Sequence, residues 1–170
     1  LAPVIVPAVN EVSGNALSHR AIVAPSTEVF VSDRNVRFRE MEYAIPLDSL
    51  AEAFDGVRKV IDDKGYRVSF PIEVRVATGD DASISAAHDR DTTYIAVHQY
   101  RGMEWRPYFE AVEAIMDDYA GRPHWGKRHF QTAATLAPRF PQWDSFQAAR
   151  NELDPSRTFT NAYAERVLGP

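Results

Sequence analysis

The 170-residue sequence contains no cysteine. Disulfides, thiolate metal sites and a cysteine nucleophile are therefore excluded, while the redox compartment stays open. No apolar run approaches the roughly 20 residues that a membrane-spanning helix needs, so we expect a cytoplasmic protein that associates with a membrane at most peripherally. Basic residues are outnumbered by acidic ones, and the net charge is −5 with a pI near 5.5. This balance gives no electrostatic support for binding nucleic acid.

The residues that are present are typical of a folded globular domain. Hydrophobic residues make up 45% of the chain and charged residues 25%, and the length fits one domain, or one domain and a piece. The chain begins with LAPVIVPAV and has no initial Met. We therefore expect a C-terminal fragment, in which residues 1–35 form a connecting segment and residues 36–170 form the domain.

Side-chain patterns along the chain predict an α+β fold. Alternating residues predict strands at 36–45, 66–77 and 93–99. Helical spacing predicts long helices at 50–64 and 105–119, followed by a helical tail at 133–137, 141–153 and 162–168. The first 35 residues give a weaker pattern, which predicts a helix at 9–22 and a strand at 28–32. This order indicates an antiparallel sheet covered by helices on one face, with the other face left open.

The stretch GRPHWGKRHF, residues 121–130, concentrates side chains that can do chemistry. Pro123 fixes its own φ, and Gly126 permits a backbone geometry that a side chain would block. A rigid loop of this kind could stabilise developing negative charge. The side chains that it would present are His124, Trp125 and Lys127. The alternative is a basic surface turn in which Trp125 closes the edge of the core.

A second candidate site is the pair Glu73 and Arg75, which point the same way because they are two residues apart on a predicted strand. The pair could be an exposed ion pair, worth less than about 1 kcal/mol. It could also bind a polyol, since a carboxylate accepts and a guanidinium donates hydrogen bonds to hydroxyl groups. His98 would join this face if the two strands are neighbours, although a lone His at a strand end is usually structural.

Several other carboxylates have a simpler interpretation. Glu40 and Glu42 could be catalytic, but solvated side chains, or partners for Arg37 and Arg39, are the simpler expectation. The acidic loop between residues 78 and 92 fits neither a calcium nor a zinc pattern. We therefore predict no metal site.

Six stretches of the sequence together resemble the C-terminal part of the aldonolactone oxidases, FAD enzymes of the vanillyl-alcohol-oxidase type, with the alditol oxidases as close relatives. These stretches are VRFREMEYAIP (36–46), FPIEVRVATGDD (70–81), HWGK (124–127), FPQWDSF (140–146), RNELDP (150–155) and FTNAYAERVLG (159–169). None is decisive alone, but they follow one another in the order and spacing of the family. The resemblance implies that residues 36–170 are the cap, or substrate, domain and that an N-terminal FAD-binding domain precedes residue 1.

The reaction implied by this resemblance is hydride transfer from a carbon of a sugar 1,4-lactone, as in D-arabinono-1,4-lactone oxidase, to flavin N5. Molecular oxygen or another acceptor would then take the electrons. Arg75, Glu73 and Lys127 would act on the substrate, with His98 as a further contact, while Lys127 and His124 would face the cofactor. We expect the 170-residue chain alone to be inactive. The alternatives are an alditol oxidase acting on polyols and, from another class, a non-catalytic α+β binding module.

Overall fold

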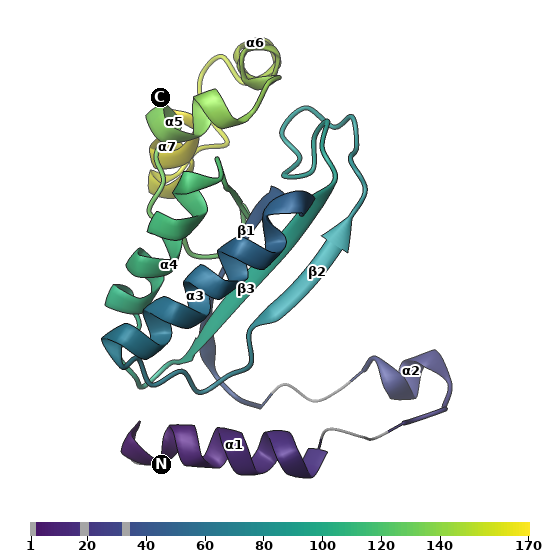
Figure 1. Ribbon diagram of the computed structural model, residues 1–170. Coiled ribbons are helices and arrows are strands. Elements are labelled where there is room, and N and C mark those ends of the chain that lie inside the picture. Colours follow the sequence, from purple (N-terminus) through teal and green to yellow (C-terminus); the bar gives the residue numbers. More distant parts are fainter. Residues whose placement is uncertain (1–2, 18–20, 32–34) are drawn as a thin grey trace.

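A computed structural model describes residues 3–17, 21–31 and 35–170 of the protein (Figure 1). The strands are β1 (Phe38–Pro46), β2 (Glu73–Ala77), β3 (Thr92–Tyr100) and β4 (Arg122–Pro123). The α-helices are α1 (Val6–Leu17), α2 (Ser26–Val29), α3 (Leu50–Lys64), α4 (Arg106–Asp118), α5 (Ala133–Leu136), α6 (Trp143–Leu153) and α7 (Ala162–Leu168). Short 3-10 turns lie at Pro3–Ile5, Leu47–Ser49 and Ala137–Arg139. The predicted α+β class is confirmed.

The four strands form one antiparallel sheet in the order β2-β3-β1-β4. β1 and β3 pair along their whole length, from Phe38 opposite Tyr100 to Pro46 opposite Thr92. Ala96 in the middle of β3 lies between Glu42 of β1 and Glu73 of β2. Because directly opposed residues in antiparallel strands share a face, this register brings polar residues of three strands onto the outer face of the sheet.

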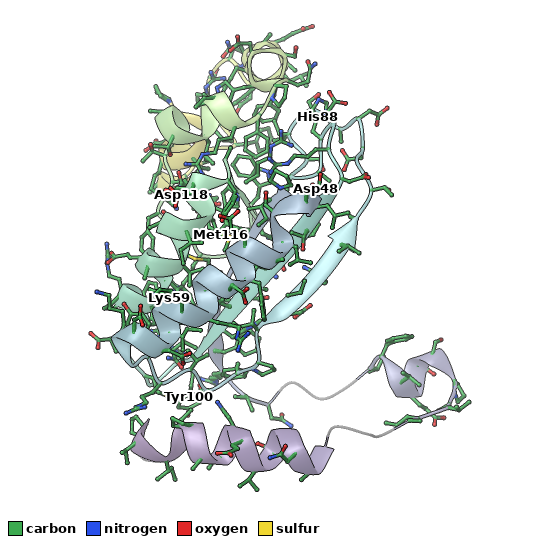
Figure 2. The ribbon with its side chains drawn as sticks, in the orientation of Figure 1. Asp48, Lys59, His88, Tyr100, Met116 and Asp118 are labelled. Carbon is green, nitrogen blue, oxygen red and sulfur yellow. The ribbon has the colours of Figure 1, made fainter. Side chains whose placement is uncertain are left out.

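Helices α3 and α4 lie across the other face of the sheet, which we call the covered face (Figure 1). Met41, Tyr43 and Ile45 alternate with the polar residues of β1 and are fully buried. Met116 of α4 lies between the helix layer and the sheet, whereas Lys59 lies on the exposed side of α3 (Figure 2). The buried core of this face consists of Met41, Tyr43, Ile45, Ala53, Val57, Val68, Ile95, Val97, Tyr108, Phe109, Val112 and Met116.

The covered face also contains a buried carboxylate, Glu113, which is only 7% exposed. The Tyr43 hydroxyl donates a hydrogen bond to its Oε2 atom at 2.5 Å, and the Phe130 backbone N–H donates another at 2.8 Å. Burial raises the pKa of Glu113, and it also raises the pKa of Tyr43. The carboxylate therefore ties α4, β1 and the segment after β4 together through uncharged donors.

The helical tail after residue 130 has a small core of its own. It is built around Leu136, Phe140, Trp143 and Val167, and Trp125 packs against it. The Trp125 indole N–H donates to the Ile84 carbonyl at 2.9 Å. Trp125 therefore anchors the loop at 121–130 to this second core, as the alternative interpretation of that loop expects.

Two expectations near the start of the domain are wrong. The strand expected at 28–32 is the short helix α2, whose Glu28 and Val29 amides donate to the Pro25 carbonyl; Ser32 lies outside the described residues. The strand expected at 66–77 begins only at Glu73, because Pro71 has no N–H to contribute to a ladder. A third expectation, the helix at 9–22, is displaced: α1 runs from Val6 to Leu17, and residues 18–20 of the expected helix lie outside the described residues. Across the described ranges, each helix is too short or too polar to cross a membrane.

Candidate functional site

The outer face of the sheet gathers charged residues from three adjacent strands. Glu40 and Glu42 come from β1, His98 from β3, and Glu73 and Arg75 from β2. In the register, Glu40 is opposite His98, and Arg75 is opposite Tyr94. The structure therefore brings the predicted pair and His98 together, and adds two carboxylates that the sequence analysis did not favour.

Glu42 lies at the centre of this group and is only 1% exposed. Its Oε2 atom accepts hydrogen bonds from Arg75 Nη2 at 2.5 Å and from Lys127 Nζ at 3.0 Å. Burial alone would raise the pKa of Glu42, but the hydrogen bonds and charges of Lys127 and Arg75 outweigh it and hold this pKa below its ordinary value. The hydrogen bond to Glu42 likewise raises the pKa of the Arg75 guanidinium.

Lys127 reaches the outer face from the loop that the sequence analysis singled out. The loop follows the edge of β1, where the His124 amide donates to the Glu42 carbonyl at 2.9 Å and the Arg128 amide to the Glu40 carbonyl at 3.0 Å. The side chain of Lys127 then turns over the sheet, is 18% exposed, and places Nζ 2.6 Å from Glu40 Oε1. The expected rigid presentation of Lys127 thus arises from backbone pairing along β1.

His98 holds the other side of Glu40. Its Nε2 lies 3.0 Å from Glu40 Oε1, and its ring packs against Phe38 and Phe70 at centroid distances of 5.3 and 5.9 Å. Because a carboxylate can only accept, Nε2 carries the proton of this contact and donates the hydrogen bond to Glu40. The Nδ1 atom is buried, and no described residue bonds to it. His98 therefore acts on Glu40 and does not present a free nitrogen to solvent.

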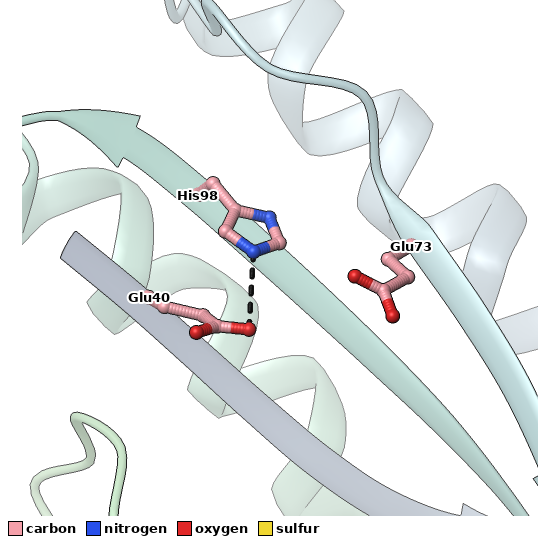
Figure 3. Close-up of side chains that lie close together, drawn as sticks. All are labelled: Glu40, Glu73 and His98. Carbon is pink, nitrogen blue, oxygen red and sulfur yellow. Dashed lines mark ion pairs between the residues drawn. The ribbon is translucent and has the colours of Figure 1, made fainter. Parts of the chain in front are cut away.

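Glu73 lies across His98 from Glu40 (Figure 3). Its Oε1 atom is 3.4 Å from Arg75 Nε, and both side chains are about half exposed. One ligand atom from each of Glu40, Glu73 and His98 falls within 4.8 Å of the others, a spacing that a divalent cation can use. The Lys127 ammonium, however, already bonds the same Glu40 oxygen that faces His98, so positive charge is supplied there by the protein itself.

His124 is not brought into this cluster. It is exposed, and its Nδ1 accepts a hydrogen bond from the Gly126 amide at 3.0 Å, so its contact with a cofactor stays a prediction. Gly126 does not adopt a positive φ. The glycine that the loop requires is Gly121, where an added Cβ would lie 2.7 Å from the Met116 carbonyl oxygen.

Glu40 and Glu42 are the residues that sequence reasoning missed. Of the suggested partners, Arg37 precedes β1, and Arg39 is odd-numbered on the strand and therefore points to the opposite face. Arg39 indeed stacks on Trp105, with its guanidinium carbon 5.3 Å from the ring centroid. The usable signal was the strand parity of β1 together with the cation Lys127, to which the sequence analysis assigned no carboxylate partner.

A cavity of about 600 Å³ adjoins the outer face. Glu40 and Lys127 line it together with Trp105, Trp125 and Tyr163, among others. Its volume lies in the range of small-molecule sites, which combine apolar walls with a few convergent polar groups. The outer face and this cavity share Glu40 and Lys127, so one ligand could contact both.

Comparison with known proteins gives a consistent result. The sequence profile of the family described as "D-arabinono-1,4-lactone oxidase" matches residues 1–167 of this chain. Among curated relatives, "L-gulono-1,4-lactone dehydrogenase" of Mycobacterium tuberculosis is 54% identical over 168 residues, which is 99% of this chain and 39% of the relative.

Two more distant relatives extend the comparison. "L-gulonolactone oxidase" of Bos taurus is 32% identical over 148 residues, covering 84% of this chain and 34% of the relative. "Alditol oxidase" of a Streptomyces species is 32% identical over 130 residues, covering 76% of this chain and 31% of the relative. The chain therefore spans well under half the length of each of these relatives.

Proposed function

The chain belongs to the D-arabinono-1,4-lactone oxidase family, and from this premise we propose that it is the C-terminal substrate domain of an FAD-linked oxidoreductase that oxidises a CH–OH group of a sugar 1,4-lactone. Residues 36–170 form the cap over the substrate in this proposal, and residues 1–35 connect the cap to an FAD-binding domain. The family relationship and the geometry of the outer face support it.

The observation that carries the proposal is the arrangement of donors and acceptors on the outer face. Glu73 is half exposed and can accept hydrogen bonds, and Arg75 beside it is half exposed and can donate them. A sugar ring presents hydroxyl groups that do both, and neighbouring hydroxyls lie close enough to use a carboxylate and a guanidinium together. Lys127 adds a further donor at the boundary with the cavity.

The residues of this chain have distinct roles in the proposed reaction. Oxidation removes a hydride from the substrate carbon and a proton from its hydroxyl oxygen. Arg75 and Lys127 donate hydrogen bonds to that oxygen and stabilise the negative charge that develops as the proton leaves. Glu73 holds a second hydroxyl and so fixes which carbon is presented. His98 keeps Glu40 in place beside Lys127.

The chain's residues fit one side of a flavin site. Lys127 lines the cavity of about 600 Å³, and in this proposal Lys127 and His124 belong to the loop that would face FAD. When bound by the whole protein, FAD supplies the hydride acceptor. The protein's own contribution is to orient the substrate and to exclude water from it. The electron acceptor that follows, molecular oxygen or another oxidant, is set by groups for which this chain shows no candidate among its described residues.

An alditol is the alternative substrate, since one relative is an alditol oxidase. The lactone is favoured because the lactone dehydrogenase is 54% identical over nearly the whole chain, against 32% for the alditol enzyme. Both substrates are neutral and polyhydroxylated, so the outer face suits either one.

A substrate panel on the whole protein tests the proposal. The purified protein should show a flavin absorbance spectrum, and anaerobic addition of a gulono- or arabinono-1,4-lactone should bleach it. Bleaching by alditols alone would transfer the assignment to the polyol oxidases. A colourless protein, with no flavin after reconstitution, would favour the non-catalytic binding module.

A further inference from the structure

We propose that Glu42 is a positioning residue, which holds Arg75 and Lys127 together as one donor unit for the substrate oxygen. This inference rests on the function proposed above, because it assigns a role inside that site. Glu42 does not touch the substrate in this proposal. It acts through the two cations, which come from separate segments of the chain and have no direct contact with each other among the described interactions.

The geometry of Glu42 fits a shared anchor. Both cations bond the same oxygen, Oε2, at 2.5 and 3.0 Å. A single acceptor atom thus sets the positions of two donors that are 52 residues apart in sequence, 75 against 127. The second oxygen, Oε1, is buried without a partner among the described residues. Burying a carboxylate oxygen without a partner lowers the stability of the fold. The presence of Glu42 at this position is therefore explained better by the two cations that Oε2 binds than by stability alone.

Each cation depends on Glu42 to a different degree. Arg75 lies on β2, an edge strand exposed along all five residues. Besides Glu42, the contacts of its guanidinium with described residues are the longer one with Glu73 at 3.4 Å and the ring of Tyr94 at 5.7 Å. Lys127 keeps a second carboxylate, Glu40, at 2.6 Å. Loss of Glu42 should therefore free Arg75 to move, while Lys127 stays near its place with one restraint fewer.

The competing explanation is that Glu42 forms a structural ion pair. The need for a negative charge at Glu42 distinguishes a positioning role from this explanation. Burying an ion pair often stabilises a fold no better than apolar side chains of the same volume. A positioning role, by contrast, requires the negative charge itself, because it must hold two protonated donors. The variant Glu42→Gln keeps the shape and removes that charge, and Glu42→Asp keeps the charge on a side chain one methylene shorter.

The test uses the whole protein and two readouts. The first is kinetic: Glu42→Gln should lower kcat/KM by about tenfold to a hundredfold, the scale of lost hydrogen bonds to charged groups. The effect should nearly vanish when Arg75 is already replaced by Ala, because groups that act as a unit are not additive. Glu42→Asp should recover part of the loss. Glu152→Gln, on the exposed surface of α6, is the control for removing one negative charge.

The second readout does not depend on activity. Lys59, Lys64 and Lys127 are the three lysines of this chain, so competitive labelling with an amine-reactive reagent compares Lys127 with two exposed references in the same molecule. Glu42→Gln should speed the labelling of Lys127 by about threefold to tenfold, the equivalent of one hydrogen bond's net contribution. Lys59 and Lys64 should label at unchanged rates. If Glu42→Gln does not fold, Glu42→Asp replaces it, and its shorter side chain should speed the labelling of Lys127 by a smaller factor.

The outcomes separate the two proposals. A wild-type protein that oxidises no lactone or alditol removes the proposed function, whatever the labelling shows. An active wild type, with Glu42→Gln that keeps both its kcat/KM and its Lys127 labelling rate, overturns the positioning role of Glu42 alone. Faster unfolding of Glu42→Gln with unchanged kinetics would also overturn it, since that result describes a structural ion pair.

Discussion

Glu42 and Tyr43 are neighbours on β1, yet they belong to two regions with opposite electrostatics. Tyr43 points to the covered face, where it donates a hydrogen bond to the buried carboxylate of Glu113. Glu42 points to the outer face, where it is itself a buried carboxylate bonded to Arg75 and Lys127. The pKa of Glu113 is raised and the pKa of Glu42 is lowered. Two carboxylates with similar burial thus have opposite shifts.

The difference teaches that the partners, and not the burial, decide what each carboxylate does. Glu113 has uncharged donors, which satisfy its oxygens without offsetting the cost of burying its charge. Glu42 has two cations, whose charge outweighs that cost. The covered face therefore uses a polar group to connect secondary-structure elements, whereas in the proposed function the outer face holds charged donors for a ligand. We expect substitutions on the two faces to separate activity from stability.

The largest effect is expected from Arg75→Ala on the outer face. Removing a charged donor from the substrate oxygen should lower kcat/KM of the whole protein by about a hundredfold or more. The melting temperature should also fall modestly, because the Arg75 side chain is half exposed but its loss leaves the buried Glu42 with one cation fewer. Glu73→Gln should lower kcat/KM less than additively in the same background. Steady-state kinetics and thermal unfolding check this, with the exposed Arg58→Ala as the matched control. Normal kinetics with a lower melting temperature would make the pair structural.

The next prediction tests whether one residue can contribute both to activity and to stability. Lys127→Met should slow substrate oxidation and also destabilise the fold by about 1–3 kcal/mol, because it leaves Glu40 and the buried Glu42 each with one partner fewer. The side chain is thus more than a surface charge. Denaturant unfolding and anaerobic single-turnover kinetics measure the two effects. Lys59→Met, at an exposed i,i+4 pair with Asp63, should change neither. A stable, fully active Lys127→Met variant would contradict both assignments.

The same loop fits a charge-stabilising role in a redox site. If Lys127 faces bound flavin, Lys127→Met should also lower the flavin reduction potential. The Glu40 and Glu42 carboxylates already offset the ammonium, so we expect a shift of no more than about 30 mV, equivalent to about 1.4 kcal/mol for two electrons. A dye-equilibrated redox titration measures it. An unchanged potential would restrict Lys127 to the substrate side.

The contrast between the covered face and the outer face also explains how much of the structure could be predicted from the sequence. Strand parity placed Glu73 and Arg75 on one face and put His98 beside them once the strands were adjacent, and the structure brings these three together. The fold class followed from hydrophobic periodicity, which is strongest in long amphipathic elements such as α3 and α4. These features depend on local sequence, and they were predicted correctly.

The main failure of the sequence analysis concerns contacts between residues that are far apart in the sequence. Glu42 looked like a solvated residue because its partners, Arg75 and Lys127, are 33 and 85 residues away. No local pattern encodes such a pairing. The wrong strand at 28–32 is a different case, because the local signal was present: a helix begins directly after Pro25. His124 lies three residues before Lys127, and its ring accepts a hydrogen bond from the Gly126 amide; its expected contact with a cofactor stays a prediction.

A smaller effect is expected on the covered face. Tyr43→Phe removes the hydroxyl that bonds Glu113 and leaves that buried carboxylate short of a donor, which should cost about 1–2 kcal/mol of stability. Substrate kinetics should be unchanged, since the ring still fills the core. Urea unfolding of the whole protein measures the change, with Tyr100→Phe at a half-exposed position as the control. A loss of activity at wild-type stability would show that the covered face is coupled to the site.

The smallest effect, and the most direct test of the comparison, is a pair of opposite pH dependences. The folded pKa of Glu42 lies below the ordinary value of 4.5, so the stability that its ionisation contributes is present above pH 4.5 and is lost as the pH falls through the folded pKa. The folded pKa of Glu113 lies above 4.5. Its contribution is therefore complete below pH 4.5 and is lost as the pH rises through the folded pKa.

Melting temperatures of the whole protein between acidic and neutral pH can separate these two terms, because the other titrating groups cancel in a difference between wild type and variant. The advantage of the wild type over Glu42→Gln should shrink as the pH falls below 4.5. Its advantage over Glu113→Gln should shrink as the pH rises above 4.5. If both differences changed in the same direction with pH, the charge of the partners would not explain the contrast between Glu42 and Glu113. The proposal that the outer face holds charged donors for a ligand would then lose its support.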